Sequence, residues 1–258
     1  MPLSKRLKKR LLKLLVLLIA LAIVAFAVIY YLQYQLEKKS EQTFYKAFGI
    51  SVPTNYKLNG IDVSKHQSYI YWTSVKQMKI DSIAIDFAFI KATEGLSDVD
   101  AMFKRNWQLS KQNNIPHGAY HYFIATKDGK KQAQNFIKNV ALEKGDLPPV
   151  VDIEQDFGIE PKVLQANLIK YLNELEQYYK VKPIIYSYVD FYNNFLGDGF
   201  DNYPLWIAHY TEQNEPNINR DWLFWQHSEM GRVNGITEKV DFNVFNGDSS
   251  LFQNLLIK

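Results

Sequence analysis

The chain has 258 residues, 47% of them hydrophobic, no cysteine, and a formal net charge of +3 at pH 7. The absence of cysteine excludes disulfides and thiolate metal sites, and the length suits one large domain or two small ones. Residues 1–36 contain six basic and no acidic side chains, which leaves 24 basic and 27 acidic side chains, a net of −3, for the rest. This mildly acidic remainder has no basic tract and argues against a nucleic-acid partner.

An uninterrupted apolar stretch of 19 residues, Leu14–Leu32, dominates the N-terminal part of the chain. As a helix it would extend about 28 Å, close to the bilayer hydrocarbon thickness of about 30 Å. Basic residues precede the stretch and tyrosines follow it, as expected for a cytoplasmic flank and an interfacial aromatic belt. We therefore predict a basic cytoplasmic N-terminus over residues 1–13, a single transmembrane anchor over residues 14–34, and a chain that continues outside the cytoplasm.

Two other interpretations of this apolar stretch stay open. Ala25-Phe26-Ala27 offers a small-x-small site at which a signal peptidase would cut, and the mature protein would then be secreted. A buried core helix is disfavoured because the segment is apolar on all sides rather than along one stripe. With either an anchor or a cleaved signal, the remainder of the chain leaves the cytoplasm.

Residues 35–57 are polar and mixed in charge, and we predict a linker or stalk there. From Leu58 onward, strand-like runs alternate with helix-like segments, and several runs are continuously apolar, as in strands covered on both faces. The predicted strands are Leu58–Val63, Ser82–Lys91, His117–Phe123, Pro149–Glu154, Lys182–Ser187, Leu205–His209, Leu223–Gln226 and Lys239–Phe242. The predicted helices are Trp72–Met78, Ala101–Asn114, Lys130–Leu142, Pro161–Tyr179 and Asp190–Leu196. This order predicts an α/β fold over residues 58–258, an irregular TIM-like barrel of about eight strands whose last helices are missing.

Asp152 and Glu154 close the apolar run that begins at Pro149. Because strand side chains alternate with a period of two, both carboxylates face the same side, with Cα atoms roughly 6.5–7 Å apart. Glycosidases use one acid and one carboxylate in this range of separation. Two neighbouring carboxylates also push their pKa values apart, so that one can stay protonated near neutral pH. A strand end with two solvated acids is the alternative interpretation of this pattern alone.

Further acids fall where other predicted strands end, at Asp62, Glu94 and Asp241. In a barrel of this type, the functional side chains gather at the C-terminal ends of the strands. A ring of carboxylates with few basic partners raises some of their pKa values, as acid catalysis requires.

Aromatic and amide side chains are predicted at the same rim and are candidates for substrate binding: Tyr120, Tyr122, Tyr186, Trp206, Tyr210 and Gln226. Aromatic faces offer a flat apolar platform to the C–H surfaces of sugars, and a phenol can also form a hydrogen bond. For each aromatic residue, ordinary core packing is the competing interpretation.

Several motifs resemble the glycoside hydrolase family 25 lysozymes, in the family's order and spacing over about residues 58–246. They are Gly-Ile-Asp-Val-Ser at 60–64, Phe-Ile-Lys-Ala-Thr-Glu-Gly at 89–95, Gly-Ala-Tyr-His-Tyr at 118–122, Asp-Ile-Glu at 152–154, Leu-Trp-Ile-Ala-His-Tyr at 205–210, Trp-Gln-His-Ser at 225–228 and Val-Asp-Phe-Asn at 240–243. The resemblance implies a flattened β/α barrel that cleaves the β-1,4 bond between N-acetylmuramic acid and N-acetylglucosamine in peptidoglycan.

The resemblance also implies roles for individual residues. Glu154 corresponds to the family's proton donor, Asp152 to the stabilising partner carboxylate, Asp62 to a third acid, and Asp241 to a further carboxylate of the site. The substrate's acetamido oxygen or a carboxylate would attack the anomeric carbon, and the sequence leaves both routes open. Family members usually carry a wall-binding module or a secretion signal, whereas this chain has an apparent anchor.

No cofactor or metal ion is expected. The chain lacks nucleotide-binding glycine patterns and the Gly-x-Ser-x-Gly motif, and two histidines of one strand, His117 and His121, make an incomplete metal site. We expect a monomeric hydrolase that acts on peptidoglycan glycan strands. The rival hypotheses are a glycosidase for another N-acetylhexosamine polymer, such as chitin, and a catalytically silent glycan-binding module.

Overall fold

The computed structural model describes residues 5–37, 42–212 and 214–258. Contacts divide the chain into two compact units, Met1–Ser40 and Glu41–Lys258. Residues 1–4 of the predicted cytoplasmic segment and residues 38–41 of the predicted linker lie outside the described residues.

The first unit contains one helix, α1 (Lys5–Glu37). Its segment Lys13–Leu32 is long and apolar enough to cross a membrane, and none of that segment is buried. A signal sequence near the N-terminus has the same properties, so length and composition agree with either of the two export interpretations.

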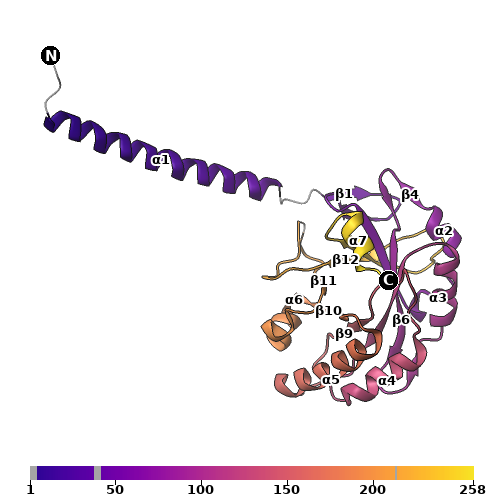
Figure 1. The fold of residues 1–258 in the computed structure, drawn as a ribbon. Helices are drawn as coiled ribbons and strands as arrows, with labels where there is room; N and C mark the ends of the chain where they lie inside the picture. The colour runs from indigo at the N-terminus through magenta and orange to yellow at the C-terminus, as the bar shows by residue number, and fades with distance from the viewer. Residues whose placement is uncertain (1–4, 38–41, 213) are drawn as a thin grey trace. The chain divides into compact units, whose positions relative to one another are not determined.

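The second unit is a closed barrel of mixed strand direction, as Figure 1 shows, and the predicted fold class is confirmed. Around the barrel the strands are β3 (Leu58–Val63), β6 (Phe87–Glu94), β8 (His117–Tyr122), β9 (Val150–Asp152), β10 (Ile184–Tyr188), β11 (Leu205–Ala208), β12 (Phe224–Gly231) and β13 (Val240–Phe245). Pairing of β3 with β6 closes the sheet. Short strands flank it: β7 (Asp98–Val99) at the end of β6, and the pair β4 (Lys79–Ile80) and β5 (Ile83–Ala84).

Helices cover the outside of the first half of the barrel, as predicted (Figure 1). They are α2 (Trp72–Gln77), α3 (Phe103–Gln112), α4 (Gly129–Asn139), α5 (Pro161–Tyr179) and α6 (Val189–Phe191), the last continued by a π turn at Tyr192–Leu196 and a 3-10 turn at Gly197–Phe200. α5 has its predicted bounds because Pro161 occupies the first turn and an apolar stripe beyond it is fully buried. A 3-10 turn at Lys65–Gln67 follows β3.

A C-terminal helix, α7 (Ser249–Leu255), was not predicted. The Asp248 carboxylate caps it by accepting a hydrogen bond from the Leu251 amide at 2.8 Å. Phe252 then packs against Phe87 and Phe245, at the end of the barrel where β6 begins and β13 stops. The helix therefore closes the end opposite to the carboxyl ends of the parallel strands.

Aromatic rings fill the barrel interior. Phe89 and Trp206 stack with their ring centroids 4.3 Å apart, and Phe87 and Phe224 pack edge to face beside them. An interior packed this densely leaves room for a binding site at a rim of the barrel rather than through it.

β13 runs antiparallel to both of its neighbours, β12 and β3. The predicted strand Lys239–Phe242 placed Asp241 near a strand end, but β13 continues to Phe245 and Asp241 is its second residue. Asp241 reaches the rim where the parallel strands end because the reversed strand begins there, and it pairs in register with Asp62.

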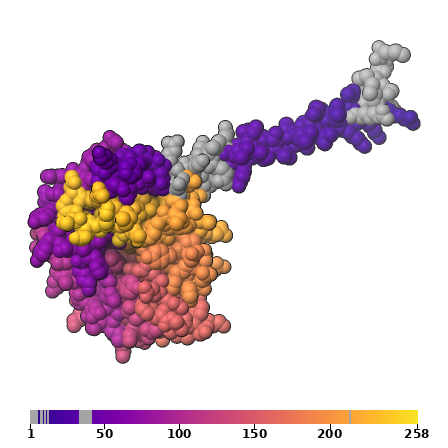
Figure 2. Space-filling model, turned by 180° about the vertical axis from the view of Figure 1, so that it is seen from behind, coloured from indigo at the N-terminus to yellow at the C-terminus, as the bar shows by residue number. Residues whose placement is uncertain are grey.

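A two-stranded hairpin, β1 (Gln42–Tyr45) and β2 (Ile50–Pro53), precedes the barrel. The Phe48 ring is fully buried and lies 5.3 Å from the Phe242 ring, and the Arg232 amide donates to the Phe48 carbonyl at 2.8 Å. Figure 2 shows the N-terminal end of this unit against its yellow C-terminal part. The prediction of a linker over residues 35–57 differs from this arrangement, because apolar side chains of the hairpin belong to the barrel core.

Candidate active site

A cavity of about 180 Å³ opens at the rim where the parallel strands end. It is lined by Asp62, Tyr120, Asp152, Glu154, Tyr186, Tyr188, Trp206, Tyr210, Gln226, Glu229 and Asp241. Four of these five acids were predicted: Asp62 lies near the end of β3, Asp152 ends β9 with Glu154 two residues further on, and Asp241 is the second residue of β13. The predicted carboxylates therefore do lie together at this cavity, with the exception of Glu94.

Asp62 is held by two amide side chains from neighbouring strands. Its Oδ2 accepts hydrogen bonds from Gln226 Nε2 and Asn243 Nδ2, each at 2.8 Å. Asn243 in turn accepts a hydrogen bond from Trp206 Nε1 at 2.7 Å. These donors leave Asp62 oriented as a hydrogen-bond acceptor at the floor of the cavity.

Two tyrosines continue this network on the other side of Gln226. The hydroxyls of Tyr186 and Tyr210 donate to Gln226 Oε1 at 2.8 and 2.6 Å. The amide orientation of Gln226 is thereby fixed, with its oxygen toward the phenols and its nitrogen toward Asp62.

Asp62 and Asp241 share a hydrogen bond and have unequal pKa values. Burial raises the pKa of Asp62 to about 6, although its hydrogen bonds oppose the increase. Burial, the charge of Asp62 and the hydrogen bond to it raise the pKa of Asp241 to about 9. Near neutral pH, Asp241 is therefore the protonated partner that donates to Asp62.

Asp152 and Glu154 form the second hydrogen-bonded carboxyl pair. Burial, followed by the charge of Glu154, raises the pKa of Asp152 well above its ordinary value. Burial also raises the pKa of Glu154, while hydrogen bonds from Tyr188 and Asp152 and the charge of Lys91 oppose that increase. Both carboxyls therefore keep a proton to higher pH than free carboxyls do, and the increase is larger for Asp152.

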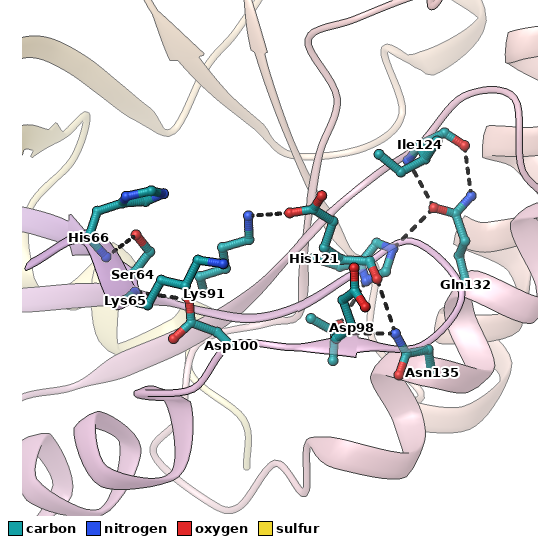
Figure 3. A network of polar contacts seen from close by, with 12 residues as sticks. Ser64, Lys65, His66, Lys91, Asp98, Asp100, His121, Ile124, Gln132 and Asn135 are labelled. Carbon is teal, nitrogen blue, oxygen red and sulfur yellow. Dashed lines mark hydrogen bonds and ion pairs between the residues drawn. The ribbon is translucent and has the colours of Figure 1, made fainter. Parts of the chain in front are cut away.

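Glu94 and Tyr122 were predicted at the rim but do not line the cavity. Glu94 instead pairs with Lys91, whose Nζ lies 2.7 Å from Glu94 Oε2 and 4.8 Å from the centre of the Tyr122 ring. Lys91, which appears in Figure 3 with its ion pair, lowers the pKa of both Asp152 and Glu154. Glu94 and Tyr122 thus contact Lys91, and Lys91 in turn affects the acid pair. The sequence prediction did not include Lys91.

The aromatic residues differ in what they offer to a ligand. Trp206 and Tyr186 are almost fully buried and packed against each other, with their ring centroids 4.5 Å apart. Tyr120 and Tyr210 are partly accessible, and Tyr188 is 36% exposed. The accessible faces at the cavity therefore belong to these three tyrosines, while the other two rings support the polar network.

Sequence reasoning missed Tyr188 and Glu229 as lining residues. Tyr188 ends β10, one residue beyond the predicted strand, and its alternation with Tyr186 would have placed both on one face. β12 extends to Gly231 and has an irregular register after Gln226, so simple alternation from Gln226 does not reach Glu229.

Buried histidines lie behind the rim rather than at a metal centre. His121 Nδ1 and Thr93 Oγ1 are 2.7 Å apart, and its Nε2 lies 3.3 Å from Gln132 Oε1 (Figure 3). Across residues 5–37, 42–212 and 214–258, no group of three or more His, Cys, Asp or Glu side chains could hold a metal ion.

A closed β/α barrel with paired carboxyls in a tyrosine-walled rim cavity defines the class of barrel glycoside hydrolases. Residues 61–236 match the model of the glycosyl hydrolases family 25, and the chain belongs to this family of enzymes.

Individual relatives agree with this assignment. The chain is 45% identical over 202 residues to the uncharacterized protein YegX of Escherichia coli K12, covering 78% of this chain and 74% of that protein. It is 32% identical over 212 residues to lysozyme M1 of Streptomyces globisporus, covering 75% of this chain and 69% of the lysozyme. Among solved structures, a family 25 glycosyl hydrolase from Bacillus anthracis superposes with a TM-score of 0.74 at 31% identity, covering 80% of this chain and 96% of that one.

Proposed function

We propose that the chain is a muramidase that cleaves the β-1,4 bond between N-acetylmuramic acid and N-acetylglucosamine in peptidoglycan. The observation that carries the proposal is the hydrogen-bonded pair Asp152 and Glu154, whose pKa values are both raised, in a cavity walled by tyrosines. Similarity to a bacterial protein named as a lysozyme supports the substrate class.

In this proposal Glu154 is the general acid. When the glycosidic oxygen approaches Glu154, the shared proton crosses the hydrogen bond from Asp152 and then passes to the leaving oxygen as the C–O bond breaks. This transfer leaves Asp152 ionised at the moment when positive charge develops on the sugar ring, so its charge stabilises the reacting centre.

The acetamido oxygen of the substrate then attacks the anomeric carbon and forms a cyclic intermediate. Water opens that ring and returns a proton to Glu154, which completes the hydrolysis. Direct attack by a carboxylate oxygen is the alternative route. A substrate whose acetamido group is replaced by a hydroxyl group distinguishes them, because only the carboxylate route would still hydrolyse it.

The remaining residues of the site hold the substrate in this proposal. Asp62 accepts a hydrogen bond from the sugar in the orientation that Gln226 and Asn243 impose. The accessible rings of Tyr120, Tyr188 and Tyr210 offer apolar faces to sugar C–H surfaces, and the buried Tyr186 and Trp206 keep the network rigid. Asp241 acts through Asp62, to which it is hydrogen-bonded.

We further propose that residues 14–34 anchor the enzyme in the membrane with its catalytic domain on the outside. The apolar helix and its basic N-terminal flank support this orientation. Secretion after cleavage of the segment is the competing outcome, and the peptidoglycan substrate is reached in either case.

The test uses the full-length protein in detergent, as wild type and as the Glu154→Gln and Glu160→Gln variants. Glu160 is an exposed carboxylate six residues further along the chain and serves as the matched control. The wild type and the control should release reducing ends from purified peptidoglycan, and Glu154→Gln should lose at least about 100-fold in rate. Sedimentation with the polymer but no release by the wild type would contradict the enzyme and support a silent binding module.

A further inference from the structure

A second pocket, which we call the hairpin pocket, adjoins the catalytic cavity. Its volume is about 270 Å³, and its lining includes Gln42, Ile50 and Ser51 from the β1–β2 hairpin and Tyr210, Glu212 and His227 from the barrel. Tyr210 lines both the hairpin pocket and the catalytic cavity. A branched ligand in the cavity can therefore extend past this side chain into the pocket.

The hairpin forms a fixed wall of this pocket. Ile50 and Val52 are buried in the barrel core, and Phe48 is anchored against Phe242 and by its carbonyl to the Arg232 amide. These hairpin residues precede the stretch 61–236 that matches the family model.

The lining indicates what the pocket can bind. No lysine or arginine is found among the described residues that line it, which disfavours phosphate and other anions. The half-exposed carboxylate of Glu212 favours a cationic group, and its distance of 4.0 Å from His209 Nε2 leaves it weakly paired. Gln42 and Ser51 add neutral hydrogen-bonding groups rather than an aromatic platform for a sugar ring.

His227 is a second observation that points to a ligand. Its side chain is 5% exposed, and neither ring nitrogen has a hydrogen-bond partner in the part of the chain that the structure describes. Burial lowers the pKa of His227 to about 3, so the imidazole is neutral and offers one donor and one acceptor. The amides of a peptide supply the matching acceptors and donors, and leaving such buried groups unpaired is unfavourable.

We propose that the hairpin pocket binds the stem peptide attached to muramic acid, with the free amine of its diamino residue at Glu212 and a peptide amide at His227. The inference rests on the proposed function for its substrate. The pocket makes the enzyme select glycan strands that still carry stem peptides over strands from which the peptides have been removed.

The first test measures binding of a synthetic stem tetrapeptide with a free lysine amine to full-length protein by calorimetry. Glu212→Gln should weaken binding by about 2- to 5-fold, and acetylation of the lysine amine should have a similar effect. Ser51→Trp, which fills the pocket, should abolish binding. Glu238→Gln, an exposed carboxylate that lines neither pocket, should leave binding unchanged.

The second test compares KM for intact peptidoglycan with KM for the same strands stripped by an amidase. Ser51→Trp and Glu212→Gln should raise KM for intact strands alone. Absence of peptide binding by the wild type, or equal binding by Ser51→Trp, would overturn the proposal for the pocket. Peptide binding without hydrolysis would instead remove the proposed function and leave the pocket assignment standing.

Discussion

Asp241 on β13 lies directly opposite Asp62 on the antiparallel strand β3, and the two carboxyls share a hydrogen bond. Two like charges in this position of a strand pair destabilise a sheet. The conflict is relieved because Asp241 keeps its proton up to a pKa of about 9. The folded protein therefore binds a proton at Asp241 that the unfolded chain releases near pH 4.

This proton makes stability depend on pH. Because the folded pKa of Asp241 is raised, its effect favours the native state fully below about pH 4 and is progressively lost as pH rises toward about 9. Asp241→Asn keeps a donor without the titration, so its melting temperature should equal that of the wild type near pH 4 and exceed it at pH 8. Asp221→Asn, at an exposed position, should behave like the wild type throughout. A gain that is largest at pH 4 would contradict the assignment of the proton to Asp241.

Lys91 should set the alkaline limit of activity. Its charge lowers the pKa of Asp152 and Glu154, so Lys91→Met should let the pair keep its proton to higher pH. The alkaline limb of the pH profile of kcat/KM should move upward by about 1 unit. Lys162→Met removes an exposed charge and should leave the profile in place. A downward shift, or an equal shift in both variants, would show that Lys91 does not act on the pair.

Gln226 should contribute to both stability and activity, since it links Asp62 to Tyr186 and Tyr210. Gln226→Met keeps the side-chain volume but removes the acceptor of both tyrosine hydroxyls and one of the two amide donors to Asp62. The free energy of unfolding should fall by about 1–3 kcal/mol, and kcat should fall because Asp62 is no longer oriented. Denaturant unfolding measures the first effect, with Gln253→Met on the exposed face of α7 as the control. Unchanged stability would mean that the network is not formed.

The hairpin should behave as part of the barrel unit. Phe48→Ala should reduce the free energy of unfolding by about 3–5 kcal/mol because the ring is fully buried. Phe44→Ala, at a ring that is 65% exposed on the same hairpin, should change it by less than about 0.5 kcal/mol. Equally small changes in the free energy of unfolding of both variants would contradict this account and support the predicted linker.

The N-terminal segment is tested by where the protein is found and by its mass. An anchored enzyme should stay in carbonate-washed membranes at the full mass of 30.1 kDa. Recovery of a soluble form that begins just after Ala27 would support cleavage instead.

Much of the fold could be predicted because several barrel strands are recognisable apolar runs and α5 carries its own start signal at Pro161. The direction of β13 could not be predicted, since strand direction depends on how the sheet closes rather than on local sequence. The hairpin at residues 42–53 was missed because it is rich in polar residues and only a few of its side chains, such as Phe48, are buried in the core.

The acids of the site could be found because strand ends share a rim. Their partners could not be found in the same way. Hydrogen bonds such as that from Asn243 to Asp62 join residues 181 positions apart and depend on strand register. Likewise, it is Lys91 rather than the predicted Glu94 that affects the acid pair, and this depends on side-chain packing.

The most direct measurement of the central claim is the identity of the sugar ends that the enzyme creates. Purified peptidoglycan is incubated with full-length wild type and Glu154→Gln, the products are reduced with borohydride, and the new ends are identified by mass spectrometry. The account predicts reduced muramic acid ends from the wild type alone. Reduced glucosamine ends would contradict the assigned bond, and an absence of new ends from the folded wild type would contradict the enzyme itself.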